Sequence, residues 1–137
     1  MSADYGASWT AGGSSKVWSC VASSDDGTRL IAGVGINGGY LYTSSNSGTS
    51  WTTGTGAPSS EWAAVASSST GTRLAAAQSG GYIYTSADSG ATWTQRTASG
   101  SKYWDDIDMS ADGSTIVAVI GYDYPMISTD FGLTWTK

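Results

Sequence analysis

The chain has 137 residues, a formal net charge of −5 and only 12% charged residues, and this length predicts one domain. The acidic balance and the lack of a basic stripe disfavour nucleic acid or an anionic membrane as a partner. No apolar run approaches the roughly 18 residues of a membrane span, and no basic segment followed by an apolar one indicates a signal peptide, so an extracellular and a cytoplasmic location both stay open.

The residue types favour short strands and tight turns. Glycine occurs 19 times, tryptophan seven times and tyrosine eight times, which is typical of strands joined by turns. Cys20 is the single cysteine, so no internal disulfide can form, and we expect a small buried residue there. Histidine is absent, which removes histidine-based acid–base catalysis and histidine-ligated zinc. No zinc spacing, phosphate loop or EF-hand loop occurs, so we expect no metal and no cofactor.

The first element in the chain is an eight-residue motif, Ser2 to Trp9, that is written four times. It reads SADYGASW, SSNSGTSW, SADSGATW and STDFGLTW, and its first serines stand at 2, 44, 86 and 128, a constant step of 42. A fixed period of roughly 20–50 residues indicates a repeat architecture.

Three further elements recur between successive copies of the motif. A first strand begins near a tryptophan (Trp18, Trp62 or Trp104), and a glycine-containing turn leads from it to a second and then a third strand. The motif closes the next hairpin, and its own tryptophan opens a fourth strand. The expected first strands are 17–23, 61–67 and 103–109, the second strands 28–32, 72–76 and 114–118, and the third strands 40–43, 82–85 and 124–127.

Each 42-residue unit therefore reads as a four-stranded antiparallel meander. Four short strands per unit at this period predict an all-β fold made of β-propeller blades. A β-solenoid would have shorter rungs without hairpin turns, and a sandwich would not repeat so regularly. We expect a single partial propeller, 1–137, with a spare motif hairpin and outer strand at 1–10 and blades at 11–53, 54–96 and 97–137.

The motif Ser-x-Asp-x-Gly-x-Thr-Trp resembles the Asp box, or BNR repeat, in all four copies. That motif occurs in sialidase-like propellers, xyloglucanase-type glycosidases, sortilin-type receptors and a photosystem assembly factor. The resemblance implies a propeller fold and a structural role at the blade periphery, away from a ligand site, but no single activity. The structural residues it implies are Asp4, Gly6, Trp9, Asn46, Gly48, Trp51, Asp88, Gly90, Trp93, Asp130, Gly132 and Trp135.

The residues of the motif suit a tight turn. The aspartates can accept hydrogen bonds from backbone amides within the turn, and Asn46 keeps one acceptor oxygen without the charge. The glycines are expected at positive φ, and the tryptophans are expected to fold over the turn and pack between sheets. A metal site at the aspartates is disfavoured, because each copy offers one carboxylate far from the others.

The arginines do not support a sialidase. Sialidases need a cluster of three arginines, and this chain has only Arg29, Arg73 and Arg96. Arg29 and Arg73 occupy the same repeat position in successive blades, which is typical of scaffold or surface residues.

One first strand departs from its siblings. The third reads Trp104-Asp105-Asp106-Ile107-Asp108, where the others read WSCVA and WAAVA. Because the first strand of a blade is innermost, we expect these residues to line a central channel. Asp106 and Asp108 alternate with Ile107, so both carboxylates project to one side with β-carbons about 7 Å apart.

This acidic strand is the best candidate site for a cation, a sugar or acid–base work, and the alternative is a solvated acidic rim. A glycosidase would need two carboxylates roughly 5–10 Å apart. The candidate ligand-binding residues are Tyr103, Trp104, Asp105, Asp106, Asp108, Tyr122 and Asp123.

The number of blades predicts assembly. Three first strands mean three blades, whereas closed propellers typically use four to eight, and an open arc would leave large apolar faces exposed. A second copy joined head to tail would give six blades, and three copies would give nine, which is less usual. Residues 1–10 duplicate 127–137, so we expect one copy to be displaced or to compete for an edge, unless the chain was cut from a longer array.

Three functions fit these observations. The first is a non-catalytic propeller module that self-assembles and binds a carbohydrate or protein partner at its channel or loop face. The second is a fragment of a glycoside hydrolase with channel carboxylates. The third is a purely structural or engineered propeller fragment without a ligand.

Overall fold

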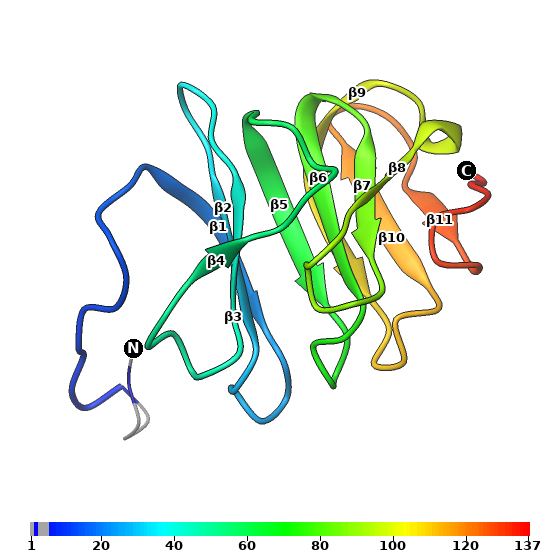
Figure 1. Cartoon of the computed structure of the whole chain (residues 1–137). Coiled ribbons are helices and arrows are strands. Elements are labelled where there is room, and N and C mark those ends of the chain that lie inside the picture. The colour runs from blue at the N-terminus through cyan, green and yellow to red at the C-terminus, as the bar shows by residue number, and fades with distance from the viewer. Residues whose placement is uncertain (1, 3–5) are drawn as a thin grey trace.

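A computed structural model of the protein describes residue 2 and residues 6–137. They form a row of three antiparallel meanders (Figure 1), one for each repeat unit, which we call blades 1, 2 and 3. A short pairing of residues 79–81 with residues 102–103 joins the sheets of blades 2 and 3. The single helical turn of the described chain is a 3-10 turn at Thr97–Ser99. No helix in the described residues is long and apolar enough to cross a membrane.

The strands of each blade pair in chain order. This confirms the predicted meander, an all-β fold of propeller blades. In blade 3, the place of a fourth strand is taken by an isolated bridge between Ile127 and Thr136. Blade 1 contains β1 (Trp18–Ser23), β2 (Leu30–Val34), β3 (Leu41–Ser44) and β4 (Thr52–Thr53), blade 2 contains β5 (Trp62–Ser67), β6 (Leu74–Gly81), β7 (Ile83–Ser86) and β8 (Thr94–Arg96), and blade 3 contains β9 (Lys102–Met109), β10 (Ile116–Ile120) and β11 (Met126–Ser128).

The second strands begin two residues later than predicted, because the preceding turn is longer. In blade 1 the Asp26 carboxylate accepts hydrogen bonds from the backbone N–H and the hydroxyl of Thr28, 2.9 and 2.8 Å away. An aspartate that binds the backbone two residues on forms an Asx turn, which keeps Thr28 out of the ladder. Asp112 makes the same bonds to Ser114 in blade 3.

Two apolar layers hold the blades together, one in each junction between neighbours. Between blades 1 and 2 the layer includes Ile31, Leu41, Trp62 and Val65. Between blades 2 and 3 it includes Ala64, Ala66, Ile83, Trp104, Ile107 and Met126. Alternate residues of β5 therefore pack against different neighbours, as expected of a strand with both faces covered.

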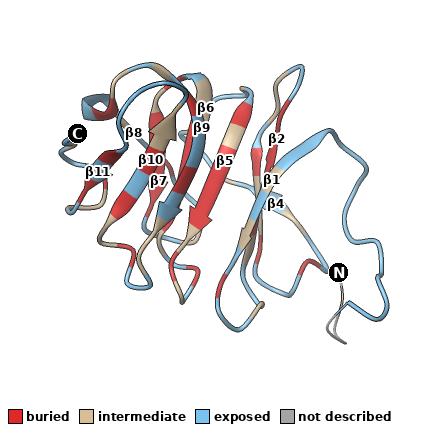
Figure 2. Cartoon of the chain, turned by 180° about the vertical axis from the view of Figure 1, so that it is seen from behind, coloured by how far each residue is buried: buried red, intermediate tan, exposed pale blue. Residues whose placement is uncertain are grey.

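The outer faces of blades 1 and 3 have no such cover. Trp18 and Val21 on β1 are 38% and 70% exposed, whereas Trp62 and Val65 at the same positions of β5 are 1% and 8% exposed. On blade 3, Val117 is 37% exposed. Figure 2 shows the contrast, with β5 mostly red and β1 mostly pale blue.

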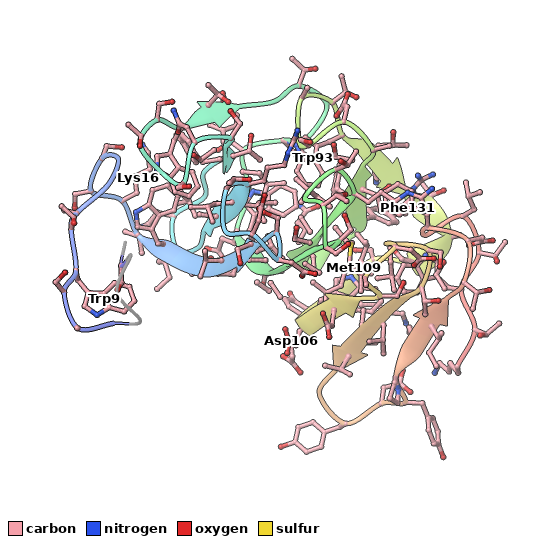
Figure 3. The ribbon with its side chains drawn as sticks, turned by 90° about the horizontal axis from the view of Figure 1, so that it is seen from below. Trp9, Lys16, Trp93, Asp106, Met109 and Phe131 are labelled. Carbon is pink, nitrogen blue, oxygen red and sulfur yellow. The ribbon has the colours of Figure 1, made fainter. Side chains whose placement is uncertain are left out.

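The first copy of the motif does not pack like the others. Trp9 is 77% exposed and stands apart from the sheets (Figure 3), which corrects the expectation that it packs between sheets. Gly6 has the expected positive φ of 89°, and Asp4 lies outside the described residues. The reason is the missing sheet, since a motif tryptophan is buried only where a blade lies beside it.

Candidate functional site

The repeated motif forms a closed hydrogen-bonded turn. In blade 2, Asp88 Oδ1 accepts from the backbone N–H of Thr92 at 2.9 Å, and its Oδ2 accepts from the Thr92 hydroxyl at 2.6 Å. Ser86 Oγ donates to Asp88 Oδ1 at 2.7 Å and accepts from the backbone N–H of Gly90 at 2.8 Å. Asp130 repeats both Thr bonds in blade 3, to Thr134.

The tryptophan of the motif binds the same turn through its indole N–H. Trp93 Nε1 donates to the carbonyl of Gly90 at 3.1 Å, and the pairs Trp51–Gly48 and Trp135–Gly132 repeat this bond. The three glycines have φ of 79°, 87° and 84°, values that residues with a side chain resist.

The carboxylates of the motif accept hydrogen bonds from groups of their own turn. Hydrogen bonds from the Thr134 hydroxyl and N–H lower the pKa of Asp130 to about 2, and the equivalent bonds from Thr92 lower the pKa of Asp88. Asn46 keeps the turn without a charge, because its Oδ1 accepts from the Ser50 N–H at 2.9 Å and its Nδ2 donates to the Ser50 hydroxyl at 2.9 Å. These contacts describe a structural element.

The acidic strand β9 presents two carboxylates on its outer face. Ile107 is buried against blade 2, at 4% exposed, whereas Asp106 and Asp108 on either side of it are exposed. Asp106 projects away from the blades in Figure 3. The Asp106 carboxylate accepts from the N–H of Ile107 at 2.9 Å, and that of Asp108 accepts from the N–H of Met109 at 2.8 Å.

These bonds satisfy amides that the sheet does not. β9 pairs with β10 along one edge only in this region, so alternate N–H groups of its other edge need partners. A charged side chain that turns back to such an edge also protects it against pairing with another strand. Asp105 is the extra residue of a β-bulge, since Trp104 pairs with Ile120 and Asp106 pairs with Val119.

The structure does not gather the remaining candidates into one pocket. Trp104 is 2% exposed, and its Nε1 donates to the Gly81 carbonyl at 2.9 Å, so it belongs to the core. Tyr103 and Tyr122 are exposed. Asp123 forms an ion pair with Lys137 at 2.9 Å, and this contact lowers its pKa. Among the described residues, no group of three acidic, cysteine or histidine side chains could hold a metal.

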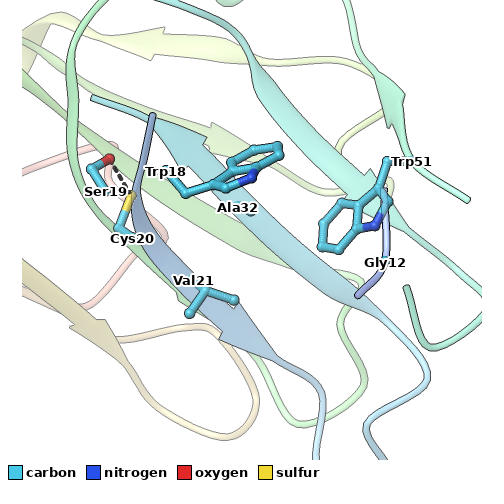
Figure 4. Close-up of a pocket in the computed structure, with 7 residues that line it drawn as sticks. All are labelled: Gly12, Trp18, Ser19, Cys20, Val21, Ala32 and Trp51. Carbon is cyan, nitrogen blue, oxygen red and sulfur yellow. Dashed lines mark hydrogen bonds between the residues drawn. The ribbon is translucent and has the colours of Figure 1, made fainter. Parts of the chain in front are cut away.

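The sequence predicted exposed apolar faces at the open ends, but not the apolar hollow that the structure shows on the outer face of blade 1. It has a volume of ≈ 320 Å³ and is lined by Trp18, Cys20, Val21, Ala32 and Trp51, among others. Figure 4 shows the two indoles on one side of the sheet, with Gly12 of the N-terminal segment beside Trp51. The signal was present in the sequence, because Trp18 begins a blade that has no earlier blade to cover it.

The two blade junctions use the same polar contacts. Trp62 Nε1 donates to the carbonyl of Gly39 in blade 1 at 3.0 Å, as Trp104 does to Gly81 of blade 2. The turns between first and second strands are also linked, since the N–H of Asp25 donates to the Ser69 carbonyl at 2.9 Å and the N–H of Ser69 donates to the Ala111 carbonyl at 2.8 Å. A junction is therefore a repeated set of donors and acceptors as well as an apolar layer.

Solved structures similar to this chain are β-propellers. YCF48 from Cyanidioschyzon merolae has a TM-score of 0.70 and 14% identity over 88% of this chain and 36% of that one. The GH74 enzyme from Niastella koreensis has a TM-score of 0.68 and 18% identity, covering 87% and 17%. The Cps50 (Swd1) β-propeller domain from Myceliophteria thermophila has a TM-score of 0.70 and 14% identity, covering 93% and 40%.

These similarities define the fold class and nothing narrower. At such identities they show that the chain has part of a β-propeller fold, and it spans two fifths or less of the length of each of the three. No protein-family model matches the sequence, and no curated protein matches it significantly.

Proposed function

We propose that this chain is a non-catalytic propeller module of the Asp-box type that joins a second copy head to tail into a six-bladed ring. In the ring, the outer face of blade 1 of each copy packs on the outer face of blade 3 of the other. The ring, and not the single chain, is the unit that offers a channel and loop face to a carbohydrate or protein ligand.

One observation carries this proposal: the outer face of blade 1 has the donor side of a junction, and the outer face of blade 3 has the acceptor side. In each existing junction the glycine that accepts from the indole N–H directly precedes a tyrosine, Tyr40 or Tyr82. At the equivalent place in blade 3, Asp123 directly precedes Tyr124. Among the described residues, the indole N–H of Trp18 has no partner. A second copy therefore offers the Asp123 carbonyl to Trp18, as Gly39 offers its carbonyl to Trp62.

The same register would also pair backbone groups of the two copies. The turns that link the first and second strands bond from blade to blade, and at the two ends of this series remain a donor, the Ala111 N–H of blade 3, and an acceptor, the Asp25 carbonyl of blade 1. Gly39 pairs with Ser60, and Gly81 pairs with Lys102, so Asp123 would pair with Lys16. This last pair carries opposite charges, so that Lys16 would share the Asp123 carboxylate with Lys137, and charge complementarity favours the correct register.

The apolar surfaces support the same arrangement. The hollow beside Trp18 and Val21 is an exposed apolar patch of the kind that indicates an interaction site. In both built junctions this position receives the preceding blade, and repeat units of this kind contact their neighbours alone. A closed two-fold arrangement uses both open faces of both copies.

The non-catalytic part of the proposal rests on the acidic strand. Asp106 and Asp108 each bind an amide of their own strand, and no histidine is available to act as an acid or base. Hydrolysis of a polysaccharide panel by the purified protein that disappears in the Asp106→Asn, Asp108→Asn double variant would overturn it, and we expect no hydrolysis by either protein.

A charge on the blade 1 face tests the assembly. Val21 is 70% exposed in the single chain, so Val21→Arg costs the monomer little but would bury an unpaired charge in the ring. We expect sedimentation velocity to show a dimer for the unchanged protein and a monomer for Val21→Arg. Ala87→Arg, at an exposed position of blade 2, is the matched control and should stay dimeric. A Val21→Arg protein that dimerises as well as the control would contradict the proposed face.

A further inference from the structure

A polar cleft opens at the edge of the junction between blades 1 and 2. It has a volume of ≈ 330 Å³ and lies between the end of β3, β4 and the motif of blade 2. Its lining includes Arg29, Thr43, Thr53, Ser89 and Gly90. We call it the blade 1–2 cleft. It is distinct from the open faces that the proposed assembly uses.

The equivalent place between blades 2 and 3 is filled by an aromatic ring. The guanidinium of Arg73 lies over the ring of Phe131, 5.0 Å from its centroid, and that of Arg96 lies 5.6 Å from it. Arg96 Nε also donates to the Thr85 hydroxyl at 2.6 Å, and Thr85 is 1% exposed. The residual cavity beside this group is ≈ 160 Å³, about half that of the blade 1–2 cleft.

The repeat shows which groups the blade 1–2 cleft keeps and which it lacks. Arg29 stands at the position of Arg73, so the cation is kept. Ser89 stands at the position of Phe131, so the ring is absent, and Thr43 is left partly exposed where Thr85 is covered.

The second arginine is absent for a steric reason. Gly54 stands at the position of Arg96, and a Cβ there would collide with the Gly90 carbonyl oxygen. The two clefts otherwise share their backbone, since Ser89 and Phe131 have φ of 59° and 57°. The space between Arg29 and Thr43 therefore has the shape of a site from which one aromatic side chain has been removed.

We propose that the blade 1–2 cleft binds a single aromatic ring, of the size of a phenyl or phenol group, which stacks on the Arg29 guanidinium as Phe131 stacks on Arg73. The charge of this guanidinium is available to a ring, because Arg29 forms no ion pair in the described part of the chain. Its contact to the Ser89 hydroxyl holds it at the mouth of the cleft. Attraction between a cation and a ring face supplies the specificity, and the threonine and serine hydroxyls suit a phenol oxygen.

The ring can come from a free small molecule or from an aromatic side chain of a peptide. The probe for both is p-cresol, the side-chain analogue of tyrosine, and cyclohexanol is the control with a ring that lacks π electrons. Small ligands of this size bind with Kd on the order of 1 mM, which NMR titration of the ¹⁵N-labelled protein detects. We expect p-cresol to shift the amide signals of Thr43, Ser89 and Gly90, and cyclohexanol to leave them in place.

Two variants separate this site from nonspecific binding. Arg29→Gln removes the cation and leaves a shorter, neutral polar side chain, and we expect it to raise Kd for p-cresol about two- to five-fold, the range of an exposed cation–π contact. Ser89→Phe places the missing ring in the cleft, in a backbone conformation that Phe131 already adopts, and should abolish the shifts. Equal binding of cyclohexanol, or p-cresol shifts that persist in Ser89→Phe, would overturn the proposal. Each readout is independent of the oligomeric state.

The two sources of the ring are distinguished by a peptide arm. A short peptide with one central tyrosine should shift the same three amides with a lower Kd than p-cresol if peptide side chains are the ligand. A Kd no lower than that of p-cresol assigns the cleft to free aromatic molecules, and a tyrosine-to-alanine peptide that shifts the same amides would contradict recognition of the ring.

Discussion

The built junctions and the open faces contain the same residues in opposite surroundings. Trp62 and Trp104 are 1% and 2% exposed inside junctions, whereas Trp18, the equivalent residue on the open face of blade 1, is 38% exposed. Trp18 and Trp62 begin the first strands of their blades, and Trp104 is the third residue of β9. The difference shows that a blade does not bury its own tryptophan. The preceding blade does, and this difference between the open ends and the middle of the chain is the basis of our proposal that the ends bind a second copy.

The largest effect should come from removing a junction tryptophan. Trp62→Ala leaves a cavity between blades 1 and 2 and removes the hydrogen bond to Gly39, so we expect a loss of about 3–5 kcal/mol in the free energy of unfolding. Trp18→Ala should lower the free energy of unfolding of the isolated chain far less, but it should abolish assembly. Urea denaturation of dilute samples measures the first effect. Equal losses in both variants would break the comparison, because they would mean that the open face is not a vacant junction.

The next effect concerns the turn-closing carboxylates. Asp88→Ala removes the acceptor of the Thr92 N–H and hydroxyl, and we expect it to lower the free energy of unfolding by about 1–2 kcal/mol. Asp88→Asn should be nearly neutral, because Asn46 makes the corresponding bonds in blade 1. Thermal unfolding of the two variants checks this. A loss in Asp88→Asn as large as that in Asp88→Ala would show that the charge, and not the hydrogen-bond pattern, holds the turn.

The same turns predict how stability depends on pH. The pKa values of Asp26, Asp112 and Asp130 fall to about 2, below the ordinary 3.8, because serine and threonine hydroxyls and backbone N–H groups bind the carboxylates. A pKa lowered by folding stabilises the protein above the unfolded pKa, and this stability is lost as the pH falls through the folded pKa. We expect Tm to be nearly constant from pH 7 to about 5 and to fall between about pH 4 and 2. In Asp112→Asn this fall should be shallower, and an unchanged profile would contradict the role of that turn.

A smaller effect distinguishes blade 3 from its siblings. Asp106 and Asp108 stand where β5 has Ala64 and Ala66, which are 5% and 3% exposed inside a junction. Burying carboxylates next to another blade costs free energy, so the Asp106→Ala, Asp108→Ala double variant should assemble at least about three-fold more tightly. Sedimentation at a series of concentrations gives the two Kd values. Weaker assembly of the variant would mean that the carboxylates contribute to the interface.

The sequence predicts the repeated parts of this molecule well. The constant step between motif serines predicts the blades, because each unit must bury one face of its sheet against the next. The motif turn follows from its residue types, since glycine tolerates positive φ and the carboxylate and hydroxyl can bind backbone N–H groups of a tight turn. What the sequence does not predict is where repeats become unequal in space. Trp9 and Trp93 look alike in the sequence, yet only Trp93 has a blade beside it and is 6% exposed.

The candidate site was less predictable for the same reason. Alternation along β9 places Asp106 and Asp108 on one face, as expected, but Trp104 belongs to the core because of its bond to Gly81. The blade 1–2 cleft depends on residues from three separate segments, such as Arg29, Thr43 and Ser89, and its emptiness shows only beside the cleft that Phe131 fills. Contacts across a junction join residues of separate segments, so the sequence of one strand does not predict them.

The mass of the protein in solution tests the central claim most directly. Multi-angle light scattering on a sizing column, run over a series of concentrations, should give twice the 14.0 kDa of the single chain, the mass of a six-bladed ring. A mass of three chains would replace two-fold closure with a nine-bladed ring. A mass of 14.0 kDa at every concentration would contradict the account, because the open faces of blades 1 and 3 would then have no affinity for each other.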